Sequence, residues 1–123
     1  MAQATVLKLP DPNAPYTLYC DTSDLAIDGV LTQWDEDQQA DRTICFISRK
    51  LQGAEYRYPV VEQEALALCF CLKKARKYLL DLQFDLYTDS TSVKYLFHKT
   101  NPSQKLQRYI MAIQEFRFRL HHV

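Results

Sequence analysis

The spacing of apolar side chains changes along the chain, and each spacing predicts a different kind of element. Alternation with period two, typical of a β-strand, is clearest in the residues that lead up to Asp21 and Asp89. A polar run at 35–41 predicts a hairpin loop between two further strands. The chain contains five strand candidates in all: residues 16–21, 27–34, 43–48, 83–88 and 116–122.

Apolar positions at helical spacing predict one long helix from about residue 60 to residue 80. Its apolar stripe consists of Val61, Ala65, Leu68, Leu72, Ala75 and Leu79. A short helix is expected near 91–98, and another at 103–115 after a turn signal. Three strands, a long helix, a strand and then helices predict an α/β fold, with a mixed five-stranded sheet flanked by helices.

The N-terminal stretch differs from the rest of the chain. Residues 1–15 contain three prolines and are interpreted as an extended lead-in rather than a packed element. The remaining residues, 16–123, are interpreted as one domain, because 123 residues are enough to bury a single core without staples.

Two of the strand candidates are near copies of each other, and each ends on an aspartate. Residues 18–23 read LYCDTS and residues 86–91 read LYTDST, so Asp21 and Asp89 occupy the same place in each. A single aspartate there is ordinarily the cap of a turn. Two converging carboxylates, however, repel each other unless a cation or a shared proton lies between them. The matched pair therefore favours a site at one edge of the sheet.

The long helix offers a third acid, and the helical angle chooses between two candidates. With a rotation of about 100° per residue, Glu64 lies about 60° from the apolar stripe and Glu62 about 100° away on the other side. Glu64 is therefore expected beside the two aspartates. Glu62 is expected in solvent, where it interacts favourably with the positive end of the helix dipole.

Asp21, Glu64 and Asp89 would form a set of hard oxygen ligands without histidine or cysteine, which suits Mg²⁺ or Mn²⁺ rather than zinc. Two such ions activate water and stabilise the leaving oxygen in phosphodiester cleavage. Basic residues near these acids fit a polyanionic substrate. The candidate nucleic-acid contacts are Ser23, Arg49, Lys73, Arg76, Lys77 and Lys94.

Composition narrows the class of protein. The net charge of zero hides an asymmetry, because residues 1–41 carry eight acids and one lysine whereas residues 42–123 carry fourteen basic and seven acidic residues. Two glycines are too few for a glycine-rich phosphate loop. The four cysteines lack the spacing of a metal site and are interpreted as buried, reduced thiols of an intracellular protein. No apolar run approaches a membrane span.

The whole chain resembles the ribonuclease H domain of reverse transcriptases from gypsy-type LTR retrotransposons. The resemblance lies in short motifs along the sequence. These are 5–11 (TVLKLPD), 19–24 (YCDTSD), 28–33 (DGVLTQ), 46–51 (FISRKL), 55–59 (EYRYP), 62–68 (EQEALAL), 73–80 (KKARKYLL) and 87–90 (YTDS). Residues 5–11 look like the segment that joins the polymerase to this domain, and alignment of the helix motif again selects Glu64.

The resemblance implies a function and a set of partners. It implies a ribonuclease H-like fold and Mg²⁺- or Mn²⁺-dependent hydrolysis of the RNA strand of an RNA–DNA hybrid, with Asp21, Glu64 and Asp89 as metal ligands. It also implies a parent polyprotein with a polymerase domain, located in the cytoplasm, the nucleus or a retrotransposon particle. Ala75 stands where relatives often have tryptophan, and Ser90 where gypsy relatives usually have histidine. The family has a fourth carboxylate beyond the last strand, so the domain is expected to be truncated at its C-terminus and to cleave poorly alone.

Two other functions remain open from the sequence. The first is a non-catalytic remnant that keeps the fold and serves a structural or nucleic-acid-binding role. The second is a phosphoacceptor signalling domain, which also places aspartates at strand ends in a Mg²⁺ site. Such domains alternate strand and helix regularly, whereas here three strands precede any long helix, so the order of elements argues against the second.

Overall fold

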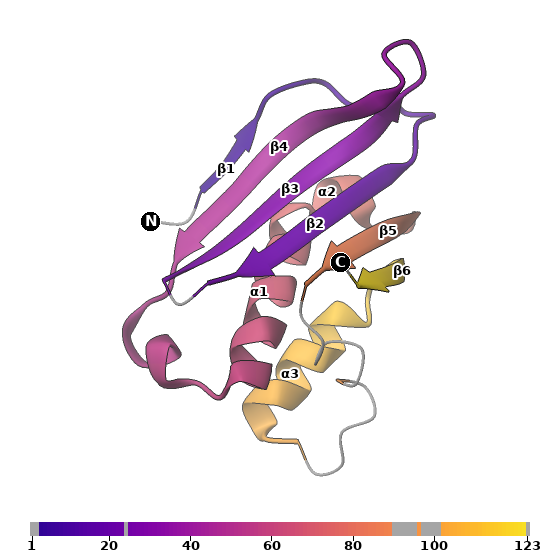
Figure 1. Ribbon diagram of the computed structural model, residues 1–123. Coiled ribbons are helices and arrows are strands. Elements are labelled where there is room, and N and C mark those ends of the chain that lie inside the picture. The colour runs from indigo at the N-terminus through magenta and orange to yellow at the C-terminus, as the bar shows by residue number, and fades with distance from the viewer. Residues whose placement is uncertain (1–2, 24, 90–95, 97–101, 123) are drawn as a thin grey trace.

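A computed structural model describes residues 3–23, 25–89, 96 and 102–122. The chain forms one mixed sheet of six strands in the order β1-β4-β3-β2-β5-β6 (Figure 1). The strands are β1 (Gln3–Val6), β2 (Tyr16–Thr22), β3 (Ala26–Asp35), β4 (Ala40–Lys50), β5 (Gln83–Thr88) and β6 (Arg117–His122). All five predicted strands are present, and the predicted arrangement of a mixed sheet with helices is confirmed.

The order of the strands brings the two aspartate motifs together. β2, β3 and β4 form an antiparallel meander, as the hairpin loop at 35–41 predicted. β5 then pairs with β2 in parallel, and β6 pairs with β5 in parallel. The strands that carry Asp21 and Asp89 are therefore neighbours that run in the same direction.

The lead-in is more ordered than the sequence suggested. Gln3–Val6 forms β1, a sixth strand that pairs antiparallel with β4, so the expectation of an unpacked lead-in was wrong for these residues. Farther along, the buried amide of Gln33 accepts a hydrogen bond from the Asp11 N–H at 2.8 Å and donates to the carbonyl of Ala14 at 3.0 Å. The prolines at 10, 12 and 15 do not prevent this packing, because Gln33 bonds to backbone groups of Asp11 and Ala14, which lie between them.

Three α-helices and one 3₁₀ helix are described. They are η1 (Gly53–Arg57), α1 (Val60–Lys74), α2 (Arg76–Leu79) and α3 (Gln104–Ile113). The helix predicted at 60–80 is thus interrupted at Ala75, whose backbone leaves the helical region at φ −95° and ψ 6°. Ser103 caps α3 by accepting a hydrogen bond from the Leu106 N–H. The helix expected near 91–98 lies outside the described residues except for Leu96, which is buried.

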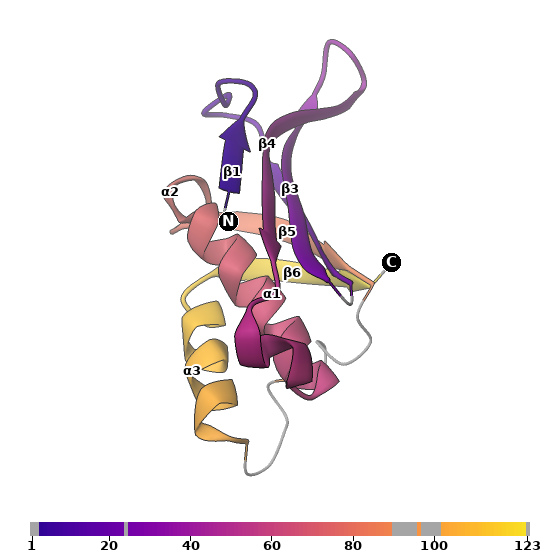
Figure 2. The ribbon, with the colours of Figure 1, turned by 90° about the vertical axis from the view of Figure 1, so that its left-hand side faces the viewer.

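The core lies between one face of the sheet and the helices, and Figure 2 shows α1 and α3 together on that side. Five of the six residues in the predicted stripe are buried, Val61 being partly exposed. All four cysteines are buried and free. Cys20 and Cys71 lie 3.4 Å apart between β2 and α1. Gly29 is required beside them, because a Cβ at this position would lie only 2.7 Å from the Cys71 sulfur.

The opposite face of the sheet carries a row of rings. Tyr19 stacks on Tyr87 with ring centroids 5.1 Å apart, and Tyr87 stacks on His121 at 4.6 Å. Because side chains alternate along a strand, Asp21 and Asp89 lie in phase with these two tyrosines. Within the described residues, no helix is long and apolar enough to cross a membrane.

Candidate metal-binding site

The carboxyl groups of Asp21 and Asp89 converge at one edge of the sheet. Tyr19 pairs with Tyr87, and Cys20 pairs with Thr88, in the parallel ladder. Asp21 is the next residue of β2, and Asp89 directly follows the end of β5. Their carboxyl groups are hydrogen-bonded to each other. The convergence predicted from the repeated motif is therefore confirmed, while the role of the two acids as metal ligands stays a prediction.

The electrostatics of Asp21 reflect this neighbour. Burial raises the pKa of the Asp21 carboxyl group, and the hydrogen bond and the charge of Asp89 raise it further. The backbone N–H of Thr22 acts in the opposite direction, and the charge of Asp28 adds to the increase. The raised pKa means that the charged form of Asp21 is disfavoured beside Asp89, the situation that the sequence argument linked to a cation or a shared proton.

Glu64 completes the group of acids. It lies in the second turn of α1 and lines the same small cavity, of about 10 Å³, as Asp21 and Asp89. Carboxylate oxygens are the donors that small, hard cations prefer. In the part of the chain that the structure describes, no three acidic, histidine or cysteine side chains already stand close enough to enclose a metal ion. The acids are thus gathered but do not form a closed coordination shell.

Glu62 does not lie where the sequence placed it. Its side chain is only 14% exposed, and its carboxylate pairs with the Lys105 ammonium of α3 at 3.6 Å. The expectation of a solvated Glu62 was wrong, because the helical angle could not reveal that α3 packs against this side of α1. The Lys105 ammonium also lies 3.5 Å from the centre of the Tyr58 ring. Glu62 is therefore part of the contact between two helices.

Three of the predicted nucleic-acid contacts lie toward the other end of the helical layer. Lys73, Arg76 and Lys77 are exposed at the end of α1 and on α2. At a rise of about 1.5 Å per residue, Lys73 lies roughly 13 Å along the helix from Glu64. Arg76 forms an ion pair with Glu115. The structure thus separates these cations from the acids, and their contact with a polyanion stays a prediction.

The other three predicted contacts have different surroundings. The Ser23 hydroxyl accepts hydrogen bonds from the N–H groups of Leu25 and Ala26, so it shapes the turn between β2 and β3. Arg49 is bound by Glu55 through two hydrogen bonds, and its side chain is 13% exposed. Lys94 lies outside the described residues. The sequence pattern did not predict that Glu55 would form an ion pair with Arg49.

Sequence reasoning missed Asp28. It is the direct cross-strand partner of Asp21 in the hairpin of β2 and β3. Opposed residues of an antiparallel pair point to the same side, so both carboxylates project from the same face. Asp28 lines a second cavity, of about 230 Å³, which Asp21 and Asp89 also border. Counting outward from a four-residue turn at 23–26 would have paired residues 21 and 28.

Comparison with known sequences assigns a family. Residues 11–116 match the family described as RNase H-like domain found in reverse transcriptase. The chain is 33% identical over 118 residues to the Retrovirus-related Pol polyprotein from transposon 297 of Drosophila melanogaster, with 96% of this chain and 11% of the relative covered. It is also 33% identical to the corresponding polyprotein from transposon opus of the same fly, with 94% and 12% covered. The chain thus spans about a tenth of the length of these relatives.

Solved structures resemble the fold. The foamy viral protease-reverse transcriptase in complex with dsDNA superimposes with a TM-score of 0.71 at 16% identity, covering 95% of this chain and 25% of that one. RNase H1 from the halophilic archaeon Halobacterium salinarum NRC-1 gives a TM-score of 0.58 at 17% identity, covering 89% and 85%. At such low identities these likenesses concern the fold alone.

Proposed function

The chain belongs to the family of RNase H-like domains found in reverse transcriptase, and from this membership we propose that it hydrolyses the RNA strand of an RNA–DNA hybrid with the help of Mg²⁺ or Mn²⁺. The observation that carries the proposal is the convergence of Asp21, Asp89 and Glu64 on one cavity from two neighbouring strands and a helix. Acids scattered over several faces would have removed its basis.

A divalent cation would offset the repulsion that disfavours the charge of Asp21 beside Asp89. These two carboxylates, with Glu64, would hold the ion. When bound, such an ion supplies an activated water and stabilises charge on the leaving oxygen. The chain's own contribution is to gather the acids at the end of two rigid strands.

The hybrid is supported as the substrate by family membership and by one related structure. The foamy viral protease-reverse transcriptase, a fold relative, is known in complex with an RNA/DNA hybrid. On this chain, the exposed Lys73 and Lys77 would meet phosphates of a duplex that extends beyond the acids. Discrimination of RNA from DNA would depend on 2′-hydroxyl groups and duplex shape more than on base sequence.

The proposal includes the setting in which the domain acts. Its relatives are parts of Pol polyproteins, so the partner would be the polymerase domain of the same polyprotein. The place of action would be the interior of the cell or of a retrotransposon particle.

Cleavage of a labelled hybrid tests the proposal. The purified chain is incubated with a hybrid carrying a labelled RNA strand, in Mg²⁺, in Mn²⁺ and in a chelator, with a DNA duplex of the same sequence as a control. We expect slow cleavage of the RNA strand only, more in Mn²⁺ than in Mg²⁺, and none for the Asp21→Asn variant. A hybrid that is bound but left intact in both metals would favour the non-catalytic remnant instead.

A further inference from the structure

The start of α1 lacks the usual side-chain cap. Its N-cap residue is Pro59, which offers no side-chain acceptor, and the N–H groups of Glu62 and Gln63 both bond to the Pro59 carbonyl. A helix start of this kind is not fixed to its surroundings by a capping hydrogen bond. Glu64 lies within the first two turns, where the packing of Ala65 and Leu68 leaves room for polar contacts to refine its place opposite the sheet.

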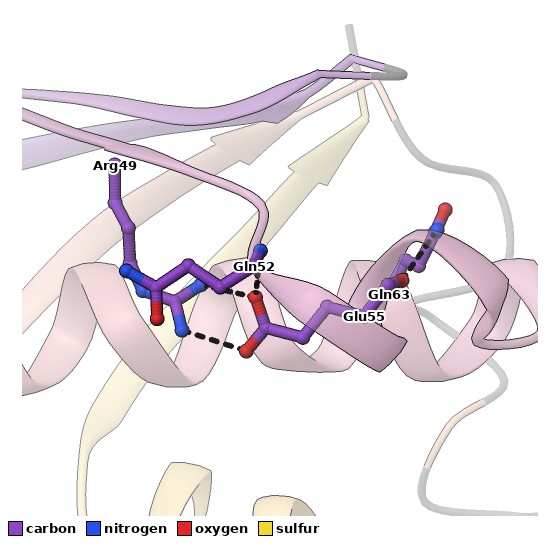
Figure 3. Close-up of polar contacts among 4 residues, drawn as sticks. All are labelled: Arg49, Gln52, Glu55 and Gln63. Atoms are coloured by element: carbon purple, nitrogen blue, oxygen red, sulfur yellow. Dashed lines mark hydrogen bonds and ion pairs between the residues drawn. The ribbon is translucent and has the colours of Figure 1, made fainter. Parts of the chain in front are cut away.

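A partly buried ion pair lies directly before this helix. The Arg49 Nη1 donates to Glu55 Oε1 at 2.8 Å, and Nη2 donates to Oε2 at 2.6 Å, which forms a two-pronged contact (Figure 3). The side chains are 13% and 14% exposed. The Gln52 N–H also donates to Glu55 Oε1 at 2.8 Å. A planar guanidinium held in this way fixes both distance and orientation, which a single lysine contact does not.

The pair connects the sheet to the residue before Glu64. Arg49 pairs with Ile27 in the ladder of β3 and β4, and Ile27 pairs with Thr22, the residue that follows Asp21. Glu55 belongs to η1, and its backbone carbonyl accepts a hydrogen bond from the side-chain amide of Gln63 at 2.9 Å. A short chain of contacts thus runs from the strand row next to Asp21, through Glu55, to the neighbour of Glu64.

We propose that Arg49 and Glu55 form a positioning pair, which holds the start of α1 so that Glu64 stands opposite Asp21 and Asp89. The inference rests on the proposed function, because it assigns the pair a role at the same metal site. It gives Arg49 an internal task, in place of the direct phosphate contact that its sequence context suggested. Neither residue lines the cavity of Asp21, Asp89 and Glu64, so both would act through Glu64.

Metal affinity separates positioning from general stability. Mn²⁺ binding to the chain is measured by calorimetry for the wild type, Glu55→Ala and Arg49→Lys, at a temperature well below the melting temperature of each. Loss of groups that orient metal ligands typically weakens metal binding about 10- to 100-fold, and we expect a weakening of this order for Glu55→Ala. Arg49→Lys keeps the charge but loses the two-pronged contact, so its affinity for Mn²⁺ should lie between those of the wild type and Glu55→Ala.

A second ion pair supplies the matched control. Glu115→Ala breaks the contact with Arg76, which joins α2 to the end of α3 far along the helical layer from Glu64. This variant should bind Mn²⁺ as the wild type does. The reversed pair, Arg49→Glu with Glu55→Arg, restores opposite charges at the same positions and should recover part of the lost affinity.

Hydrogen exchange provides a readout that does not depend on the metal. In Glu55→Ala we expect faster exchange at the amides of residues 63–66, with the amides of residues 69–72 unchanged. Wild-type affinity together with unchanged exchange in Glu55→Ala would overturn the positioning role. If the wild type binds no Mn²⁺, the proposed function fails instead, and unchanged exchange near Glu64 would then still refute the positioning of the helix start.

Discussion

At the scale of single residues, the two glutamates of α1 show what a helical angle can and cannot predict. Counting around the helix places Glu64 near the sheet, and the structure brings it to the cavity of Asp21 and Asp89. The same count places Glu62 in solvent, yet Glu62 pairs with Lys105. The angle depends on the helix alone, whereas the surroundings of Glu62 depend on where α3 packs.

Exchange of each glutamate for glutamine tests this distinction. Glu64→Gln should abolish Mn²⁺ binding or weaken it at least about tenfold, because it removes one carboxylate from an incomplete set of three. Glu62→Gln should leave binding unchanged and lower the free energy of unfolding by about 0.5–1 kcal/mol, since its ion pair is only partly exposed. Calorimetry and urea unfolding of both variants provide the measurements. The opposite pattern would mean that the two faces of α1 had been exchanged.

At the scale of elements, polar contacts fix segments that the hydrophobic pattern leaves undefined. The pattern found the five strands and the helices at 60–80 and 103–115 because each buries a regular row of apolar side chains. It did not find β1 or the packed lead-in, since a short edge strand and a proline-rich stretch have no such row. Gln33 holds the lead-in, and Arg49 with Glu55 holds the connection to α1.

Gln33→Leu tests the attachment of the lead-in. The side chain makes three hydrogen bonds to backbone groups of Asp11 and Ala14, and a leucine side chain at this position would leave these groups without their partners. We expect the free energy of unfolding to fall by about 1–3 kcal/mol, with faster proteolysis within residues 8–15. Urea unfolding and limited proteolysis check this, with Gln38→Leu in the exposed hairpin loop as a control. Equal proteolysis of both variants would contradict the attachment.

The pair of Arg49 and Glu55 predicts a dependence of stability on pH. Burial alone would raise the pKa of Glu55, but the hydrogen bonds from Arg49 and from the Gln52 N–H outweigh it, and the pKa is lowered. A lowered folded-state pKa adds stability above the ordinary glutamate value of about 4.3, and this stability is lost as the pH falls through the lowered pKa.

Urea unfolding between pH 3 and pH 7 measures this contribution. The wild type should exceed Glu55→Gln in stability by a constant amount at neutral pH, and the difference should shrink below about pH 4.3. Glu36→Gln in the exposed hairpin loop should show no such difference. A difference between wild type and Glu55→Gln that stays constant down to pH 3 would show that the ion pair does not set the titration of Glu55.

At the scale of the whole molecule, the sequence predicted the convergence of the three acids better than their surroundings. Two similar strands with the same ending placed Asp21 and Asp89 together, because parallel neighbours with matched register bring equal positions side by side. Asp28 was not predicted, because its place beside Asp21 depends on how β3 pairs with β2. The ion pair of Arg49 was not predicted either, because its partner Glu55 lies six residues away on another element. Local periodicity determines elements, while partners across elements emerge only from the assembled fold.

The gathered acids predict opposite effects on stability with and without metal. The raised pKa of Asp21 means that its ionised carboxylate beside Asp89 destabilises the folded chain relative to the unfolded one. Asp21→Asn removes this repulsion, so the metal-free variant should melt at the same temperature as the wild type or higher. Mn²⁺ should stabilise the wild type in proportion to its concentration over the dissociation constant, and should leave Asp21→Asn unaffected. Thermal unfolding of both proteins, with Mn²⁺ and with a chelator, measures this. A metal-free Asp21→Asn that melts well below the wild type would mean that Asp21 serves the fold, and the proposed relief of the repulsion by a cation would lose its basis.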